Sequence, residues 1–106
     1  MFHVKPRHFV RTILTVPGAG TAIHIAELEE IDQTSCRMLR IIELAPDESI
    51  MGLAGDGRSA GQAPEPVDVV PHPDTYGDFP DIETSRLGDA EFEALWTEAL
   101  TKFSTQ

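Results

Sequence analysis

Residues 87–103 of this 106-residue chain have the sequence LGDAEFEALWTEALTKF, in which apolar side chains recur at helical spacing. They form one stripe over about three turns of a helix, made of Phe92, Leu95, Trp96, Ala99, Leu100 and Phe103. Gly88 suits the N-cap, and Leu87 and Phe92 then take the positions of a hydrophobic staple. The pattern predicts an amphipathic helix over residues 88–103, which must bury its stripe against the rest of the chain.

Four apolar or β-branched runs precede this helix and offer a surface for it to cover. They are residues 8–16, 21–29, 35–44 and 49–54. The third run contains Ile41-Ile42, which breaks the alternation and indicates a bulge or a central strand covered on both faces. Short connections such as Pro17-Gly18 favour antiparallel neighbours. We therefore predict one α+β domain over residues 1–106: a single antiparallel meander of about four strands over residues 8–54, packed by one C-terminal amphipathic helix.

Two further segments complete the predicted organisation. Residues 1–7 form an N-terminal arm, and residues 55–87 form an irregular, acidic segment rich in glycine and proline. Connections of this length are usually functional or mobile in compact domains. Residues 67–70 can add one edge strand, although the flanking prolines limit its pairing. We expect residues 55–63 to be flexible and residues 71–84 to be ordered but irregular.

The charge of the chain is unevenly distributed. Residues 1–46 hold five acids and five bases, whereas residues 47–106 hold thirteen acids and three bases, which accounts for the net charge of -10. An acidic half repels nucleic acid and attracts a basic protein, or it serves solubility alone.

No apolar run approaches the ~20 residues of a membrane span, and no signal peptide is recognisable. The single Cys36 excludes an internal disulfide, so a cytoplasmic location is expected.

Groups that could bind a metal or act in catalysis are sparse. The richest set is His72, Asp74, Asp78 and Asp81, which lacks the alternating acids and central glycine of a calcium loop, so we interpret it as structural. His24 lies beside alanines in a predicted strand and is typical of a packed or edge histidine. We therefore predict no catalytic residue, no metal site and no cofactor.

Other polar positions also have structural interpretations. His3 and His8 are five residues apart, and this odd spacing places them on opposite faces of a strand. The glycines over residues 52–57 lack the Lys-Ser or Lys-Thr and the helix of a phosphate loop, so they predict a hinge. Cys36 is expected to be a small buried residue.

Two arginines in the third run are expected to make ion pairs. Arg37 and Arg40 lie on opposite faces of that run unless a bulge intervenes, so at least one should pair with an acid such as Glu27. We expect a surface ion pair, which contributes ~0–1 kcal/mol to stability.

Two stretches also resemble a known family. The run AELE at residues 26–29, followed by CRMLRII at residues 36–42, resembles the second and third strands of a small bacterial domain family of unknown function. Members end in a helix similar to GDAEFEALW at residues 88–96, whereas their first strand typically carries Trp and acids that this chain replaces with ILTVPG at residues 13–18. The resemblance implies a sheet-plus-helix fold without an established activity. Small acidic proteins of this kind look like immunity or antitoxin partners.

Two functions follow as hypotheses. The first is a non-catalytic protein-binding domain, for example an immunity-type inhibitor of a basic toxin. Its expected contacts are aromatic residues between acids, namely Asp74, Tyr76, Asp78, Phe79 and Asp81. The second is a small enzyme or ligand-binding domain with a pocket between sheet and helix, using His24 or His72 with a nearby Asp. Homo-oligomerisation stays open in both.

Overall fold

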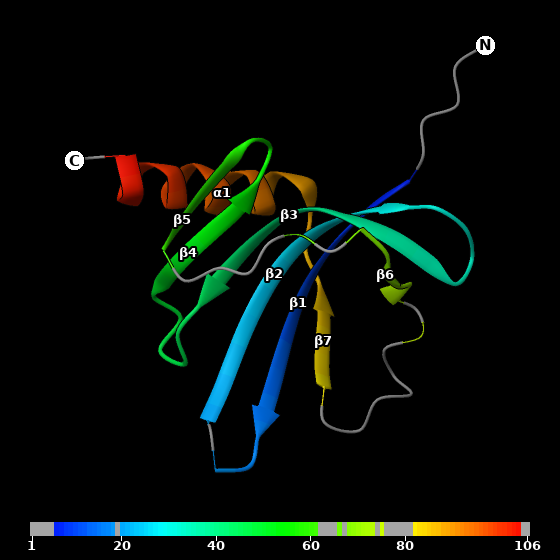
Figure 1. The fold of residues 1–106 in the computed structure, drawn as a ribbon, viewed down its shortest axis with the longest axis horizontal. Helices are drawn as coiled ribbons and strands as arrows, with labels where there is room; N and C mark the ends of the chain where they lie inside the picture. The colour runs from blue at the N-terminus through cyan, green and yellow to red at the C-terminus, as the bar shows by residue number, and fades with distance from the viewer. Residues whose placement is uncertain are drawn as a thin grey trace.

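We describe the fold from a computed structural model, in which residues 6–18, 20–61, 66, 68–73, 75 and 82–104 are described. These residues form one antiparallel sheet and one C-terminal helix (Figure 1). The elements are β1 (Arg7–Val16), β2 (Gly20–Glu30), β3 (Ser35–Leu44), β4 (Ile50–Gly55), β5 (Arg58–Gly61), β6 (Val70–Pro71), β7 (Ile82–Arg86) and α1 (Asp89–Ser104). The strand order is β5-β4-β3-β2-β1-β7, and β6 pairs with β3 outside this path.

The predicted α+β class is confirmed, but the described part of the chain forms a sheet of seven strands where about four were expected. The first four lie at the predicted runs, and three more come from residues 55–87. The expected flexibility of residues 55–63 is wrong over β5, because Asp56 and Gly57 adopt positive φ angles of 54° and 74° in a tight turn that pairs β5 with β4. Residues 71–84 were expected to be irregular, and this is wrong for residues 82–84, which form the start of β7. Its polar side chains show no apolar pattern, and it is held by its antiparallel pairing with β1.

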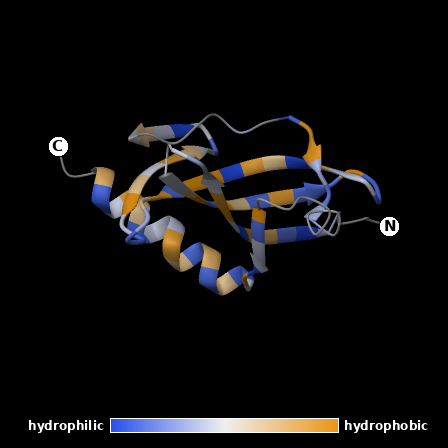
Figure 2. Ribbon diagram, turned by 90° about the horizontal axis from the view of Figure 1, so that it is seen from below, coloured by the Kyte–Doolittle hydropathy of each residue, from blue (hydrophilic) through white to orange (hydrophobic). Residues whose placement is uncertain are grey.

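The helix covers one face of the sheet and supplies the main core. Its start agrees with the sequence, since the amide of Phe92 donates to the carbonyl of Gly88 at 3.0 Å, the first bond of the helix. Trp96 is 5% exposed and stacks on Phe92 with 6.3 Å between ring centroids. Along the strands, hydrophobic and hydrophilic residues alternate (Figure 2). The core on this face is formed by Phe9, Ile23, Ile25, Ile42, Leu44, Ile50, Leu53, Phe92, Trp96 and Ala99.

A bulge in β3 changes which residues face α1. Glu27 pairs with Arg40 and Leu28 pairs with Met38, so Leu39 is an extra residue in β3. After the bulge, Ile42 belongs to the core under α1. Met38 precedes the bulge and is four residues from Ile42, so in a regular strand it would point to the same face. It packs instead with Leu28 in a second apolar cluster. The broken alternation at Ile41-Ile42 is explained by the second predicted alternative, a central strand buried on both faces, since both residues pair in regular register and the bulge lies earlier, at Leu39.

The second cluster lies on the face of the sheet away from α1. It contains Val10, Ala26, Leu28 and Cys36, with Met38 and Val70 packed against it. Val10 follows Phe9 in β1, and neighbouring residues of a strand point to opposite faces. Among the described residues, no helix has both the length and the apolar character needed to cross a bilayer.

Candidate functional site

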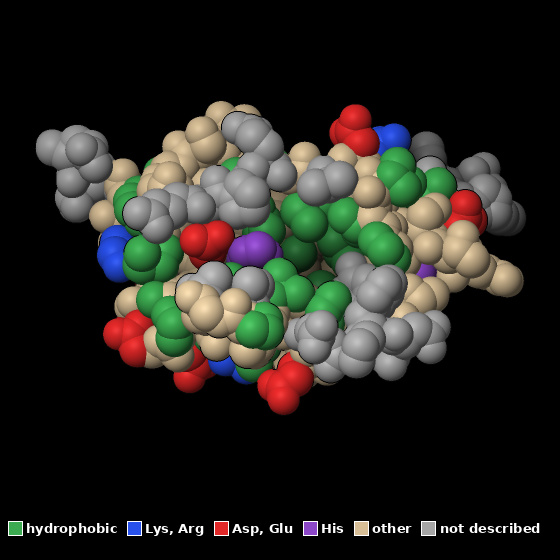
Figure 3. Space-filling view, turned by 60° about the horizontal axis from the view of Figure 1, so that its bottom comes forward, with side chains coloured by type: hydrophobic (Ala, Val, Ile, Leu, Met, Phe, Trp, Pro, Cys, Tyr) green, Lys and Arg blue, Asp and Glu red, His purple; other side chains and the backbone are tan. Residues whose placement is uncertain are grey.

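The face of the sheet away from α1 contains a hollow, which we call the apolar hollow. Its volume is about 310 Å³, and its walls come from β1, β2, β3, β6 and β7. Figure 3 shows hydrophobic side chains gathered in a hollowed surface, with a histidine beside them. The lining residues are Val10, Thr12, Leu14, His24, Ala26, Leu28, Met38, Ile41, Val70, Pro71 and Ile82.

Three polar side chains lie in one row across the strands of this face. Strand pairing places Thr12 opposite His24, and His24 opposite Glu43. The Nε2 atom of His24 lies 3.1 Å from Oε1 of Glu43. Because a carboxylate accepts hydrogen bonds, Nε2 carries the hydrogen, and a neutral His24 has its acceptor at Nδ1. Thr12 and His24 are thus the polar groups of an otherwise apolar wall.

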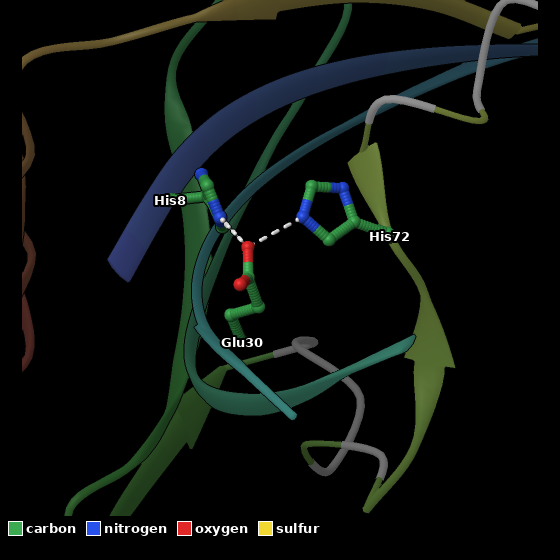
Figure 4. A group of neighbouring side chains, drawn as sticks. All are labelled: His8, Glu30 and His72. Carbon is green, nitrogen blue, oxygen red and sulfur yellow. Dashed lines mark hydrogen bonds and ion pairs between the residues drawn. The ribbon is translucent and has the colours of Figure 1, made fainter. Parts of the chain in front are cut away.

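A second polar group lies where β1, β2 and β6 come together. His8 is in β1, Glu30 ends β2, and His72 directly follows β6. The Nε2 atoms of His8 and His72 lie 3.0 Å and 2.8 Å from the same oxygen, Oε1 of Glu30 (Figure 4). The two imidazole rings meet edge to face, with 4.8 Å between their centroids. We call these three residues the His-Glu-His cluster.

The backbone around His72 holds it against the neighbouring hairpin. Its amide donates to the carbonyl of Thr34 at 3.0 Å, and its carbonyl accepts from the amide of Thr75 at 2.9 Å. Asp32 shapes the hairpin, since its Oδ1 accepts hydrogen bonds from the amides of Thr34 and Ser35 at 2.8 Å each. His72 is 3% exposed, so it is a buried residue of the fold.

Hydrogen bonding fixes the protonation pattern of the His-Glu-His cluster. Nη1 of Arg86 lies 2.9 Å from Nδ1 of His8, and a guanidinium can only donate. Nδ1 of His8 is therefore the acceptor, and its Nε2 carries the hydrogen that bonds to Glu30. The hydrogen bond from His72 and then that from His8 lower the pKa of Glu30, so this carboxylate is ionised at neutral pH.

The predicted site residues have different outcomes. Asp74, Tyr76, Asp78, Phe79 and Asp81 all lie outside the described residues, as does His3, so the predicted contact surface stays a prediction. The second hypothesis placed His24 or His72 with an aspartate in a pocket between sheet and helix. In the structure His24 contacts Glu43 and His72 contacts Glu30, and both pairs lie on the face away from α1.

The structural interpretations of two other features can be compared with the fold. Cys36 is fully buried as predicted, and burial is the main cause of its raised pKa, which favours the neutral thiol. Of the three glycines over residues 52–57, which were predicted to form a hinge, Gly52 lies within β4 and Gly55 and Gly57 lie at the tight turn into β5. Strand β5 follows this turn directly, where a phosphate loop would lead into a helix.

Sequence reasoning missed His8 and Glu30 as site residues. The sequence did contain a signal for this pair. The turn at Pro17-Gly18 joins two long strands into a hairpin, so the start of the first strand must lie beside the end of the second. His8 and Glu30 lie at those two ends. His72 could not be placed in this way. Its position depends on the pairing of β6 with β3, which brings Val70 opposite Cys36.

A charged cluster on the other face serves the fold. Arg40 donates from Nε to Oε1 of Glu27 at 2.6 Å and from Nη2 to Oε2 of Glu93 at 2.6 Å. Its guanidinium also lies 4.9 Å from the ring centroid of Phe92. The prediction that Arg37 or Arg40 pairs with an acid such as Glu27 is confirmed. The expected surface pair is instead buried, since Glu27 is 2% exposed.

No protein-family model, curated protein or solved structure matches this chain. The resemblance to a small bacterial domain family therefore stays a prediction.

Proposed function

We propose that this chain binds a small, uncharged and largely apolar molecule in the apolar hollow. The observation that supports this most directly is the pairing of Thr12 and His24 in an otherwise apolar wall, with Glu43 behind His24. Ligand sites in proteins typically combine apolar walls with a few polar groups that fix orientation, and they span ~300–1,000 Å³. The volume of about 310 Å³ suits a ligand at the small end of this range.

The lining of the hollow also defines the polarity of the ligand. Among the residues that the structure describes, this lining contains no Asp, Glu, Lys or Arg side chain, so a charged ligand would lose its hydration without gaining a partner there. Nδ1 of a neutral His24 accepts a hydrogen bond, and the hydroxyl of Thr12 can donate or accept one. A single hydroxyl or N–H group on an apolar body therefore complements this surface.

The test compares two probes that differ by one hydroxyl, 4-ethylphenol and ethylbenzene. Both are titrated into the full ¹⁵N-labelled chain, and amide shifts are followed. We expect shifts at Val10, Ala26 and Ile41, and tighter binding of the phenol. His24→Phe should keep ethylbenzene binding and remove the preference for the phenol. Shifts confined to the face under α1 would contradict the proposal.

A pair of bulky substitutions separates the hollow from the rest of the surface. Met38→Trp fills the apolar hollow and should weaken binding of both probes at least tenfold. Leu95→Trp places the same side chain on α1, whose packing is on the opposite face, and should leave binding unchanged. Equal effects of the two variants, in proteins whose circular dichroism shows that they are folded, would refute a site in the hollow.

The charge distribution favours a second candidate, a protein-binding domain for a basic partner such as a toxin. The net charge of -10 comes from residues 47–106, and long-range attraction of this kind speeds association and weakens with salt. The proposed contacts are Asp74, Tyr76, Asp78, Phe79 and Asp81.

Charge reversal tests this second candidate. Basic proteins that co-purify with the chain are purified and titrated against it at low and high salt. Asp74→Lys/Asp78→Lys should weaken binding more than Asp68→Lys/Glu98→Lys, which makes the same change in net charge at two exposed positions. An affinity that does not fall with salt, or that falls equally in both variants, would count against the proposed contact segment.

A further inference from the structure

We infer that the His-Glu-His cluster is a binding site for a divalent transition-metal ion of the zinc type. His8, Glu30 and His72 each offer one ligand atom, and these three atoms lie within 4.8 Å of one another. Two imidazoles and one carboxylate are a donor set that zinc accepts in proteins. This inference goes beyond the proposed function, because the apolar hollow can bind its ligand with or without an ion in the cluster.

Two of the three spacings between the ligand atoms are close to those of a zinc site. With zinc bonds of about 2.0–2.1 Å in a tetrahedron, neighbouring ligand atoms are about 3.3 Å apart. The observed separations of 3.0 Å and 2.8 Å from Oε1 of Glu30 to the two Nε2 atoms are a few tenths of an ångström shorter. Entry of the ion requires side-chain rotations that move Oε1 slightly away from both nitrogens and set the two Nε2 atoms, which lie within 4.8 Å of each other, about 3.3 Å apart. Three protein ligands also leave a fourth position for water or another ligand, as in catalytic zinc sites.

The elements that carry the ligands hold them in place without the ion. His8 and Glu30 are in the paired strands β1 and β2, and His72 is fixed by its backbone hydrogen bonds to Thr34 and Thr75. Because the site exists before binding, little conformational entropy is lost when the ion enters. The nitrogen donors favour zinc, cobalt, nickel or copper over magnesium and calcium, which prefer oxygen ligands.

The contact between Arg86 and His8 allows metal coordination to be distinguished from a purely structural role of the His-Glu-His cluster. Zinc bound to Nε2 of His8 requires the ring hydrogen to be on Nδ1, where Arg86 now donates. Two donors cannot bond to each other, so Arg86 opposes this coordination and must turn away when the ion binds. An amide oxygen at this position would instead accept the hydrogen from Nδ1, and such outer partners orient metal-bound histidines.

The first experiment titrates zinc chloride into the metal-free full chain by calorimetry. We expect one equivalent to bind, with at least tenfold weaker affinity in His8→Gln and in Glu30→Gln. His24→Gln removes a histidine outside the cluster and should leave the affinity unchanged. Magnesium chloride should not compete. A folded chain that binds no zinc, or an equal loss in His24→Gln, would overturn the inference.

The second experiment needs no substitution at a ligand. Long-range ¹H–¹⁵N spectra of the wild-type imidazoles, recorded with and without zinc, should show the Nε2 signals of His8 and His72 shifting on binding while those of His24 stay in place. Arg86→Gln should bind zinc at least fivefold more tightly, whereas Arg58→Gln, an exposed arginine on β5, should not. Unchanged His8 and His72 signals, or weaker binding in Arg86→Gln, would overturn coordination through these atoms.

Discussion

The guanidinium of Arg40 donates from Nε to Oε1 of Glu27 at 2.6 Å, within the face of the sheet that α1 covers. Arg7 donates to the other oxygen of Glu27 at 2.9 Å, and Arg40 also reaches Glu93 on the helix. The hydrogen bond from Arg40 to Glu27 is the main cause of the raised pKa of Arg40, which therefore keeps its charge. One arginine thus connects β3, β2 and α1.

Glu27→Gln is expected to lower the free energy of unfolding by about 1–3 kcal/mol, because Arg40 loses its buried partner and keeps only the half-exposed Glu93. Urea unfolding followed by circular dichroism measures this. Glu29→Gln, a half-buried neighbour in β2, should change stability by less than about 0.5 kcal/mol. The double variant Glu27→Leu/Arg40→Met should recover most of the loss, since apolar replacements of buried pairs are often neutral. A loss in Glu27→Gln no greater than in Glu29→Gln would contradict the role of the pair.

Stability should fall in acid through Glu93. Its hydrogen bond with Arg40 is the main cause of a pKa below the usual 4.5, so the folded state favours the ionised form. A lowered pKa contributes stability above the unfolded value, and that contribution is lost as the pH falls through the folded value. Glu93 is 49% exposed, so screening limits the effect to about 0.2–1 kcal/mol.

Comparing the wild type with Glu93→Gln in urea at neutral and acidic pH tests this. The stability difference between the two proteins should be present at neutral pH and disappear below the folded pKa. Glu98→Gln, an exposed change on the same helix, should show no such dependence. A difference for Glu93→Gln that persists in acid would refute the assignment.

Trp96→Ala should lower the free energy of unfolding by about 3–5 kcal/mol, as expected for the loss of a large buried side chain. Trp96 stacks on Phe92, and its ring centroid lies 5.0 Å from the guanidinium carbon of Arg40. Thermal and urea unfolding followed by far-UV circular dichroism avoids dependence on the lost fluorophore. Thr97→Ala, at the next and exposed position, should stay within about 0.5 kcal/mol of the wild type. Similar stabilities of the two variants would mean that the stripe is not the main core.

Gly55→Ala should be more destabilising than Gly57→Ala. Both glycines have positive φ angles, 122° and 74°. A Cβ at Gly55 would clash with the backbone of Leu39 and Arg40, whereas a Cβ at Gly57 would meet nothing within 4 Å. Gly57→Ala should therefore cost about 1–2 kcal/mol from the backbone angle alone, and Gly55→Ala should add the displacement of the bulge. The urea midpoints of the two variants measure these losses of stability. A larger loss in Gly57→Ala than in Gly55→Ala would contradict the close approach of Gly55 to the backbone of Leu39 and Arg40.

Local patterns were sufficient to predict the helix and the first four strands. The stripe ending in Phe103 and the alternating runs before it each carry their own periodicity, so no knowledge of tertiary contacts was needed. β5 was also within reach, because Asp56-Gly57 between two short runs is a strong signal for a tight hairpin. β7 carries no comparable signal, since its polar residues are ordered by the backbone of β1.

The candidate site was harder to predict because it depends on pairing between distant segments. His8 and Glu30 come together through one hairpin, which the sequence indicates. His72 is added by β6, two residues long, whose partner on β3 has no local mark in the sequence. The predicted edge strand at residues 67–70 overlaps β6 only at Val70, and the histidine that matters lies just beyond it.

The extra residue at Leu39 has a consequence for how this protein can evolve. It reverses the orientation of β3 partway along its length, so Met38 faces the apolar hollow while Arg40 supports α1. Deletion of Leu39 would make Met38 and Arg40 consecutive residues, which would still pair with Leu28 and Glu27 and would still point to opposite faces. Descendants of this sequence can therefore lose the bulge without exchanging the two faces, whereas deletion of one residue from a regularly paired part of β3 would turn every residue beyond it to the opposite face.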